Sequence, residues 1–263
     1  NLTGEEWMPV PLNSSIKGKD QMFDSVKYHN PRACNHIKIP AQNGPDIYKI
    51  AGYMLSEGSK ELNRQKLIGI NFTNKDKSVL DDFESAMKNE FRLKAYRQER
   101  KDDHDPRWMS RYISTELASF FRKNLPELLE KSDKKKVPDI LMKGKSCNVA
   151  LMLASMFEGD AHVSKKERTI RVGFASNSRK MCEQVQDLLL RFKIRSNLTE
   201  HKRSYKVSIT GFDNIKRFRS QIGFITQRKN DVIDAYLKVK SPIRSVKDLI
   251  PNSGKKIIDL LDR

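Results

Sequence analysis

The sequence predicts an α+β fold of two pseudo-symmetric αββαββα repeats, whose twisted antiparallel sheets lie side by side as a saddle. The first observation is a pair of similar nine-residue stretches, IAGYMLSEG at 50–58 and LASMFEGDA at 153–161. The second is that the order of helical and strand patterns after the first stretch recurs after the second. Internal repetition of this kind indicates a doubled architecture.

Each nine-residue stretch predicts the end of an amphipathic helix that carries an acidic residue at its eighth place. Glu57 and Asp160 hold that place, 103 residues apart. Two carboxylates brought together at neighbouring helix ends would repel each other unless a cation lay between them, which predicts a divalent metal site. Small residues would let the two helices approach backbone to backbone, and they are Ala51, Gly52, Ala154 and Ser155.

The first half of the chain is read in order from its hydrophobic periodicity and its turn residues. Residues 1–45 are rich in Pro, Asn and Gly and are expected to be a connector with short strands at 6–13 and 34–40. Ser114 or Thr115 is the expected N-cap of the last helix of the first repeat. That repeat, 46–130, is expected to hold a helix at 46–57, a strand at 64–74, a helix at 76–91, strands at 92–100 and 107–115, and a helix at 114–125.

A charged linker, 131–145, precedes the second repeat and contains Pro138. In the second repeat, 146–238, apolar and polar residues alternate from 169 to 175 and again from 205 to 210, which is typical of half-buried strands. Its expected elements are a helix at 146–160, a hairpin at 161–177, a helix at 178–194, a hairpin at 197–210 and a closing helix at 211–224. The tail, 239–263, contains one more helical stretch at 255–263, for which the sequence predicts no role.

Composition restricts the partners of the chain. It has 51 Lys plus Arg against 33 Asp plus Glu, a net charge of +18 that favours a polyanion such as nucleic acid or an acidic membrane surface. No apolar run approaches the ~20 residues that cross a bilayer, and no leader-like segment opens the chain. The three cysteines are odd in number and have no metal-ligand spacing, so we expect free thiols and an intracellular location.

The paired stretches resemble the motifs of the LAGLIDADG homing endonucleases, in the two-repeat monomeric form most like archaeal intein-encoded enzymes. The sequence departs from the family pattern at Glu57, where Asp is usual, and at Ala161, where Gly is usual. The resemblance implies a site-specific double-stranded DNA endonuclease that hydrolyses both strands across the minor groove and leaves short 3′ overhangs. It also implies Mg²⁺ held by Glu57 and Asp160, with Mn²⁺ or Ca²⁺ as possible substitutes for binding.

The same resemblance implies further residues at the reaction centre. A Lys-x-[Ile/Val]-Pro pattern before the second motif points to Lys135, and the sequence after the closing helix points to Lys229 as its counterpart. Both would be catalytic, by stabilising negative charge on the scissile phosphate. Asn74 and Asn177 follow the second strand of each repeat, where the family often places side chains that position water, although ordinary turn residues would look the same.

The polar faces of the two predicted sheets are candidate DNA-binding surfaces, since β-ribbons fit the major groove of B-DNA. Candidate base readers are outward-facing strand residues, in which Arg suits guanine and Asn suits adenine: Asn71, Thr73, Arg97, Arg111, Arg171, Lys206 and Ser208. Other basic residues are expected to hold phosphates, namely Lys165, Lys166, Arg195, Lys202 and Arg203.

Two other classes of protein were weighed. One is a catalytically inactive nucleic-acid-binding protein on the same scaffold, such as a maturase or transcription regulator, but a pure binder has no use for both acids. The other, a basic membrane-surface protein, is disfavoured because the basic residues lie on predicted strands and not along an amphipathic helix. We therefore expect a monomer that binds a long, asymmetric double-stranded DNA target in an archaeal or other prokaryotic cell.

Overall fold

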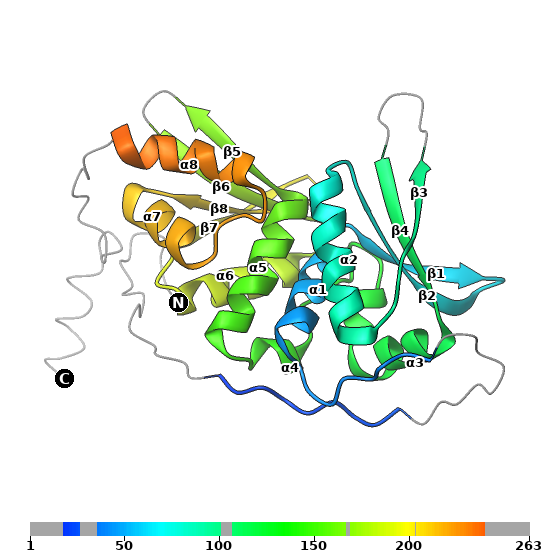
Figure 1. Ribbon diagram of the computed structural model, residues 1–263. Helices are drawn as coiled ribbons and strands as arrows, with labels where there is room; N and C mark the ends of the chain where they lie inside the picture. The colour runs from blue at the N-terminus through cyan, green and yellow to red at the C-terminus, as the bar shows by residue number, and fades with distance from the viewer. Residues whose placement is uncertain (1–17, 27–35, 101–106, 167–168, 203, 240–263) are drawn as a thin grey trace, which may run out of the picture.

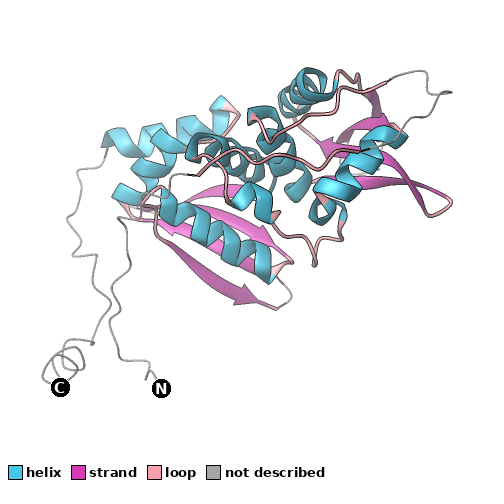
Figure 2. Cartoon of the chain, turned by 90° about the horizontal axis from the view of Figure 1, so that it is seen from below, coloured by secondary structure: helices cyan, strands magenta, loops and turns pink. Residues whose placement is uncertain are grey.

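The computed structural model describes residues 18–26, 36–100, 107–166, 169–202 and 204–239 (Figure 1). It confirms an α+β architecture of two four-stranded antiparallel sheets with helices packed on them. Figure 1 shows helices α1 and α5 side by side at the centre, with one sheet on either side of the pair. Seen from below in Figure 2, the strands again fall into two separate groups.

The first repeat follows the expected order of helix, two strands, helix, two strands and helix. Of the two residues predicted as candidate N-caps of its last helix, Ser114 is the N-cap, and its hydroxyl accepts a hydrogen bond from the Leu117 N–H at 3.2 Å. The elements are α1 (Pro45–Ser56), β1 (Gly58–Asn63), β2 (Lys66–Asn74), α2 (Lys77–Phe91), β3 (Tyr96–Arg100), β4 (Arg107–Ile113), α3 (Thr115–Asn124) and a 3-10 helix, η1 (Pro126–Leu129).

The second repeat reproduces that order after a short helix in the linker. One additional helix, α8, was not expected, and its first turn carries Lys229. The elements are α4 (Asp139–Met142), α5 (Ser146–Asp160), β5 (Ala161–Lys166), β6 (Thr169–Ser176), α6 (Arg179–Arg191), β7 (Ser196–His201), β8 (Ser204–Thr210), α7 (Phe212–Gln221) and α8 (Gln227–Val239).

Both sheets have the same strand order and the same register. The order is β1-β2-β4-β3 in one and β5-β6-β8-β7 in the other. Gly58 pairs with Phe72 in the first sheet, and Ala161 pairs with Phe174 in the second. Phe72 is therefore equivalent to Phe174, and this equivalence relates the two sheets residue by residue, except beyond Glu61, where the β1–β2 register shifts.

The two central helices are parallel and approach as closely as the small residues predict. A Cβ at Gly52 would collide with the Met152 carbonyl and with the Ser155 side chain, and one at Gly159 would collide with Ser56. Gly52 of α1 meets Ser155 of α5, and four residues later in each helix Ser56 meets Gly159. The helices therefore run in the same direction and end at the same level.

Aromatic contacts join each central helix to its own sheet. Tyr53 of α1 lies 5.0 Å from Phe72 of β2 between ring centroids, and Phe157 of α5 lies 5.5 Å from Phe174 of β6. All four side chains are fully buried. The position of each helix end is therefore fixed by the hydrophobic core of its repeat.

An extended N-terminal segment lies across the helices of both repeats, along the bottom of Figure 1. Asp20 accepts hydrogen bonds from Lys145, at the end of the linker, and from Asn148 of the second repeat. Glu116 of α3, in the first repeat, accepts one from the backbone N–H of Ile37. The segment therefore contacts both halves of the protein.

Several predictions made from the sequence are wrong, and others fall on residues outside the described part of the chain. The strand expected at 34–40 is absent from its described part, 36–40, which has no regular structure. Strand β1 and helix α8 were not predicted. The stretches at 6–13 and 255–263 lie outside the described residues. Cys147 and Cys182 are unpaired, and Cys34 is also outside the described part of the chain. Within the described residues, no helix is long and apolar enough to cross a membrane.

Candidate active site

The two motif carboxylates lie at matching ends of the central helices. Glu57 is the first residue after α1, and its N–H still donates to the Tyr53 carbonyl at 3.1 Å. Asp160 is the last residue of α5. Since the helices are parallel and in contact, the structure brings Glu57 and Asp160 together, as the sequence predicts.

The environment of both carboxylates disfavours their negative charge. Burial, together with the nearby charge of Asp160, raises the pKa of Glu57 to about 7. Burial raises the pKa of Asp160 to about 6, against the opposing effect of Lys135 and Lys229. A divalent cation between the two groups would remove that penalty, because it favours their charged forms.

Carboxylate oxygens suit hard cations such as Mg²⁺, so the chemistry of the pair fits a metal site. Among the described residues, no group of three or more His, Cys, Asp and Glu side chains could hold a metal ion. Any ion held here would therefore complete its coordination with other oxygens, such as those of water, backbone carbonyls or a bound phosphate.

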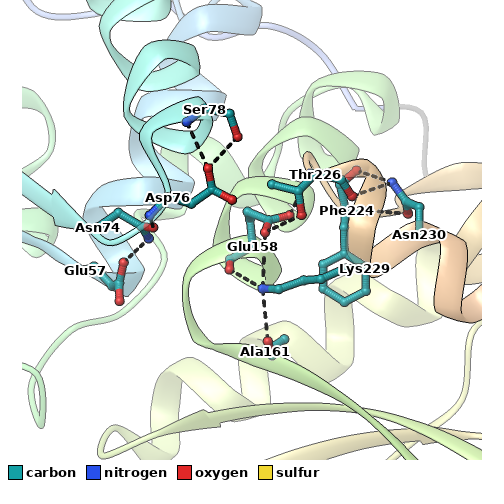
Figure 3. A network of polar contacts seen from close by, with 10 residues as sticks. All are labelled: Glu57, Asn74, Asp76, Ser78, Glu158, Ala161, Phe224, Thr226, Lys229 and Asn230. Atoms are coloured by element: carbon teal, nitrogen blue, oxygen red, sulfur yellow. Dashed lines mark hydrogen bonds and ion pairs between the residues drawn. The ribbon is translucent and has the colours of Figure 1, made fainter. Parts of the chain in front are cut away.

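Asn74 lies at the site, as predicted. Its side-chain N–H donates to Glu57 Oε2, and its side-chain oxygen accepts from the Asp76 N–H at 2.8 Å (Figure 3). Asp76 in turn caps α2 by accepting from the Ser78 N–H at 2.9 Å. The start of α2 therefore fixes the amide that orients Glu57.

The counterpart of Asn74 in the second repeat is Ser176, and the prediction of Asn177 is one residue out of place. Ser176 Oγ accepts from the Ser178 N–H at 3.1 Å, just as Asn74 accepts from Asp76, and Ser178 caps α6. Asn177 is exposed, with its side-chain N–H 3.5 Å from Ser132 Oγ. Aligning the two N-caps would have found Ser176 from the sequence.

A polar pocket opens beside Asp160, with a volume of about 230 Å³. Hydroxyl and amide side chains make up much of its wall. They are Ser56, Ser132, Ser176, Asn177 and Ser204. Such a pocket can hold ordered water close to the carboxylate.

Lys135 lies beneath the end of α1 and is only 5% exposed. Its ammonium donates to the carbonyls of Met54, at 2.5 Å, and Gly58, at 2.7 Å. Burial lowers its pKa to about 8, although the charge of Asp160 acts in the opposite direction. The side chain of Gln184 holds the following segment by bonding both the N–H and the carbonyl of Val137, at 2.8 and 2.9 Å.

Lys229 occupies the equivalent place beneath the end of α5, as Figure 3 shows. Its ammonium donates to the carbonyls of Glu158, at 2.5 Å, and Ala161, at 3.2 Å. Ala161 is the counterpart of Gly58, so the predicted pairing of the two lysines is matched by their contacts. The side chain of Asn230 holds this loop by bonding both the N–H and the carbonyl of Phe224, at 3.0 and 2.8 Å.

The two lysines differ in one respect that the sequence did not predict. Lys229 also forms an ion pair with the buried carboxylate of Glu158, at 3.2 Å. Glu158 accepts two further hydrogen bonds from Thr226, one from its N–H at 3.0 Å and one from its hydroxyl at 2.9 Å. The first repeat has Leu55 at the equivalent position, so Lys135 lacks this partner.

The sheet register decides which predicted base readers lie on the polar face, because paired residues point to the same side. Three of them lie on the face away from the helices in the first sheet, where Asn71 and Arg111 are direct partners, and three lie on the same face of the second sheet. These six are Asn71, Thr73, Arg111, Arg171, Lys206 and Ser208.

Arg97 does not face outward, and that prediction is wrong. It pairs with Ser110, which in turn pairs with the buried Phe72, so its side chain lies on the helix-covered face. There Arg97 forms ion pairs with Glu84, at 2.8 Å, and with Asp81 of α2. Ion pairing to α2 makes Arg97 part of the protein's own packing.

The residues expected to hold phosphates are scattered. Lys165 is exposed but pairs with the buried Ile170, so it points away from the polar face. Arg195 directly precedes β7, and its N–H donates to Asn214 at 3.1 Å. Lys202 is exposed in the turn between β7 and β8, and Lys166 pairs with Thr169 at the end of β5. Arg203 lies outside the described residues.

The fold and this site together define a doubled α+β protein with an acid pair at its centre and a lysine under each acid-bearing helix. A sequence profile of the LAGLIDADG-like domain matches residues 45–126 and 148–223, more than half of the chain. The chain therefore belongs to the LAGLIDADG family.

Relatives of known name are much longer than the matching region. The glutamine–fructose-6-phosphate aminotransferase of Methanocaldococcus jannaschii is 24% identical over 241 residues, which cover 89% of this chain and 21% of the relative. The replication factor C small subunit of Thermococcus kodakarensis is 31% identical over 229 residues, which cover 83% of this chain and 24% of the relative. The chain thus spans less than a quarter of the length of either relative.

A solved structure shares the fold. The homing endonuclease I-WcaI, bound to its DNA recognition sequence, superposes with a TM-score of 0.53 at 14% sequence identity. The match covers 73% of this chain and 85% of that one. At this identity the likeness establishes the fold alone.

Proposed function

We propose that this protein is a site-specific double-stranded DNA endonuclease of the homing type, with Mg²⁺ as its cofactor. The observation that carries the proposal is the pair Glu57 and Asp160 at the matching ends of two parallel helices, with a buried lysine below each helix end. A net charge of +18 supports a polyanionic substrate. Mn²⁺ would substitute for Mg²⁺, and Ca²⁺ would support binding.

The proposed reaction is hydrolysis of a phosphodiester in each strand. Water oxygen bonds to phosphorus as the bond from phosphorus to the 3′ oxygen breaks, and the 3′ oxygen leaves with a proton. Glu57 and Asp160 would hold the metal, which acidifies water and stabilises charge on the phosphate. The outcome proposed for the DNA is two cuts across the minor groove with short 3′ overhangs.

The side chains around the acids have distinct proposed roles. Lys135 and Lys229 would place positive charge at the edge of the phosphates, where negative charge develops. Their ammonium groups are already fixed by carbonyls at the helix ends, so little reorganisation is needed. Asn74 would keep Glu57 oriented, and Ser176 would take the equivalent place beside Asp160.

The named activities of the longer relatives differ from each other, although both contain a region similar to this chain. An aminotransferase and a replication factor share no reaction, so the region common to both would carry a separate activity of its own. We propose that the region is an inserted endonuclease of the intein type, acting as a monomer within a prokaryotic cell on a long asymmetric target.

The test is selection of bound and cleaved duplexes from a randomised library with Mg²⁺, followed by mapping of the cut ends. The proposal expects one recovered site, cut on both strands. Asp160→Asn should abolish cleavage and leave binding in Ca²⁺ within a few-fold of wild type, because the metal-holding charge is lost while the sheet faces are unchanged. Comparable cutting by this variant would refute the site. Binding without cleavage by the wild type would leave only a binding protein.

A further inference from the structure

The polar faces of the two sheets carry different side chains on the same backbone frame. The shared register relates Ser59 to His162, Glu61 to Ser164, Gly69 to Arg171, Asn71 to Gly173, Met109 to Lys206 and Arg111 to Ser208. No residue type is kept at any of these positions. A duplex lying across both sheets would therefore meet two different sets of groups.

On the first sheet, Arg111 is already neutralised by a carboxylate of the protein, whereas Arg100 and Arg107 lie further along the same face. Arg111 donates to Glu61 Oε1 at 2.7 Å, and the Asn71 amide donates to Glu61 Oε2 at 2.8 Å. Ser59 completes the chain by donating to the Asn71 side-chain oxygen at 2.6 Å. Only 26% of the Arg111 side chain and 16% of that of Glu61 are exposed, so solvent screens the pair weakly.

The hydrogen bonds also set the charge of Glu61. Partial burial acts to raise its pKa, but the bonds from Arg111 and Asn71 lower the pKa overall. The carboxylate therefore stays charged, and the pair with Arg111 has no net charge. The four residues of this network, Ser59, Glu61, Asn71 and Arg111, are called the neutral network below.

On the second sheet, the residue equivalent to Asn71 is Gly173. The side chains of Lys206 and His162 occupy the space that a side chain at this position would need. A Cβ at Gly173 would meet Lys206 Cε and His162 Cε1 at 2.7 and 2.8 Å. The absent side chain lets Lys206 Nζ approach His162 Nε2 to 2.9 Å across the strand. Lys206 and Arg171 have no carboxylate partner within the described residues, so their charge is available to a ligand.

We propose that the two sheets recognise their DNA half-sites by different chemistry, an inference that rests on the proposed function. Arg171 and Lys206 of the second sheet contact phosphates or guanine and release counterions, whereas the neutral network of the first sheet discriminates bases and releases none. Each phosphate contact lowers the slope of log K against log salt concentration by about 0.9. The neutral network donates and accepts hydrogen bonds in an arrangement fixed before DNA arrives, which suits base readout.

The test compares variants that each remove one positive charge from the full-length protein. Binding of the selected duplex is measured in Ca²⁺ from 50 to about 300 mM salt. Arg171→Ala and Lys206→Ala should each reduce the magnitude of the slope by about 0.9. Arg111→Ala should leave it unchanged within about 0.3 and weaken binding equally at all salt concentrations. Arg122→Ala, on the exposed surface of α3, is the matched control and should change neither quantity.

A second variant tests whether Arg111 leaves the salt slope unchanged because Glu61 neutralises its charge or only because its side chain is buried. Glu61→Gln removes the charge that Arg111 faces but keeps an acceptor, so the slope should steepen by up to about 0.9. Repeating the library selection with this variant should change base preferences only in the half-site of the first repeat. Thermal melts of each variant exclude unfolding as the cause.

Two results would overturn the proposal. A slope whose magnitude falls as much for Arg111→Ala as for Arg171→Ala would show that Arg111 leaves Glu61 to bind phosphate. A slope unchanged by Arg171→Ala and Lys206→Ala would show that the second sheet makes no such contacts. Failure of the proposed function has a different signature, since no duplex would then be selected or cut by the wild type.

Discussion

Replacing Glu57 by Gln should stabilise the protein in the absence of divalent cations. The two motif carboxylates are held together by helix packing and by burial, and both have raised pKa values. Gln removes the charge while its oxygen can still accept the hydrogen bond from Asn74. Glu57, the proposed metal ligand, is thereby expected to weaken the metal-free fold.

The magnitude follows from linkage. The pKa of Glu57 rises from 4.5 to about 7, and one unit corresponds to about 1.4 kcal/mol, so the full penalty is on the order of 3 kcal/mol. Below pH 4.5 both the folded and the unfolded states bind the proton, and there is no penalty. Between about pH 4.5 and 7 the unfolded state loses its proton first, so the stability of the wild type falls as pH rises. Above pH 7 the penalty is complete.

The assay is thermal unfolding of the wild type and of Glu57→Gln in EDTA, at intervals from pH 4.5 to 8.5. The difference in melting temperature should be near zero at the acid end and grow to roughly 5–10 °C at pH 8. Glu130→Gln, at an exposed position, is the control for loss of one negative charge and should show no such growth.

Titration with Mg²⁺ supplies the second arm. Wild type should gain about 1.4 kcal/mol when the free ion exceeds its Kd tenfold, and Glu57→Gln should gain much less. A difference between the two proteins that does not change with pH would refute the linkage argument. Equal stabilisation of both proteins by Mg²⁺ would show that the ion does not bind between the acids.

Three further predictions test the packing and the lysine positions. Gly52→Val should lower stability by roughly 2 kcal/mol or more in thermal melts, because the added atoms collide with the neighbouring helix. The control Gly44→Ala should be nearly neutral, because the atom nearest to the added Cβ lies at 4.0 Å. Lys135→Ala should slow cleavage by about 10²-fold with binding retained, whereas Lys134→Ala, at the adjacent exposed position, should leave both cleavage and binding unchanged. Equal loss of cleavage in both variants would refute the proposed role of Lys135. Asn230→Ala removes three hydrogen bonds of the loop that holds Lys229. Nicking of one DNA strand should slow more than nicking of the other. Equal slowing of both strands would contradict a separate cleavage site for each strand.

The central helices and their acids could be predicted because the signal is local and duplicated. Small and apolar residues at helical spacing specify both the helix and the face by which it packs, and the second copy supplies its partner. Gly52 and Gly159 lie where the two backbones need space, and each is visible in the sequence alone.

Strand faces were harder to predict where the partner strand sets them. Strand β3, YRQER, has no apolar alternation, so nothing in its own sequence shows that Arg97 faces α2. Strand β1 is similar, because its one apolar residue, Leu62, is exposed and the strand is specified by pairing with β2. Tertiary pairing decides such edge strands more than their intrinsic preference.

Helix α8 was missed although a signal exists. Val232, Ile233, Tyr236 and Leu237 are at helical spacing, but β-branched residues and the polar run QRKND obscure the start of the helix. The omission matters for the proposed site, since α8 carries Lys229. The sequence located this lysine through the family resemblance, and the structure supplies the reason: Glu158 and the loop closed by Asn230 hold it below α5.

The two halves keep equivalent contacts at the central helix ends but carry different side chains on their polar sheet faces, because packing constrains these two regions differently. At the centre, the ends of the two helices must pack against each other, so Lys135 and Lys229 contact carbonyls at equivalent places. The faces need only a common backbone register, because each strand pairs within its own sheet. A side chain there can change without disturbing the other repeat, as Asn71 and Gly173 show. An asymmetric target is therefore the expected partner of a doubled fold whose two sheets share one backbone arrangement but carry different side chains on their polar faces.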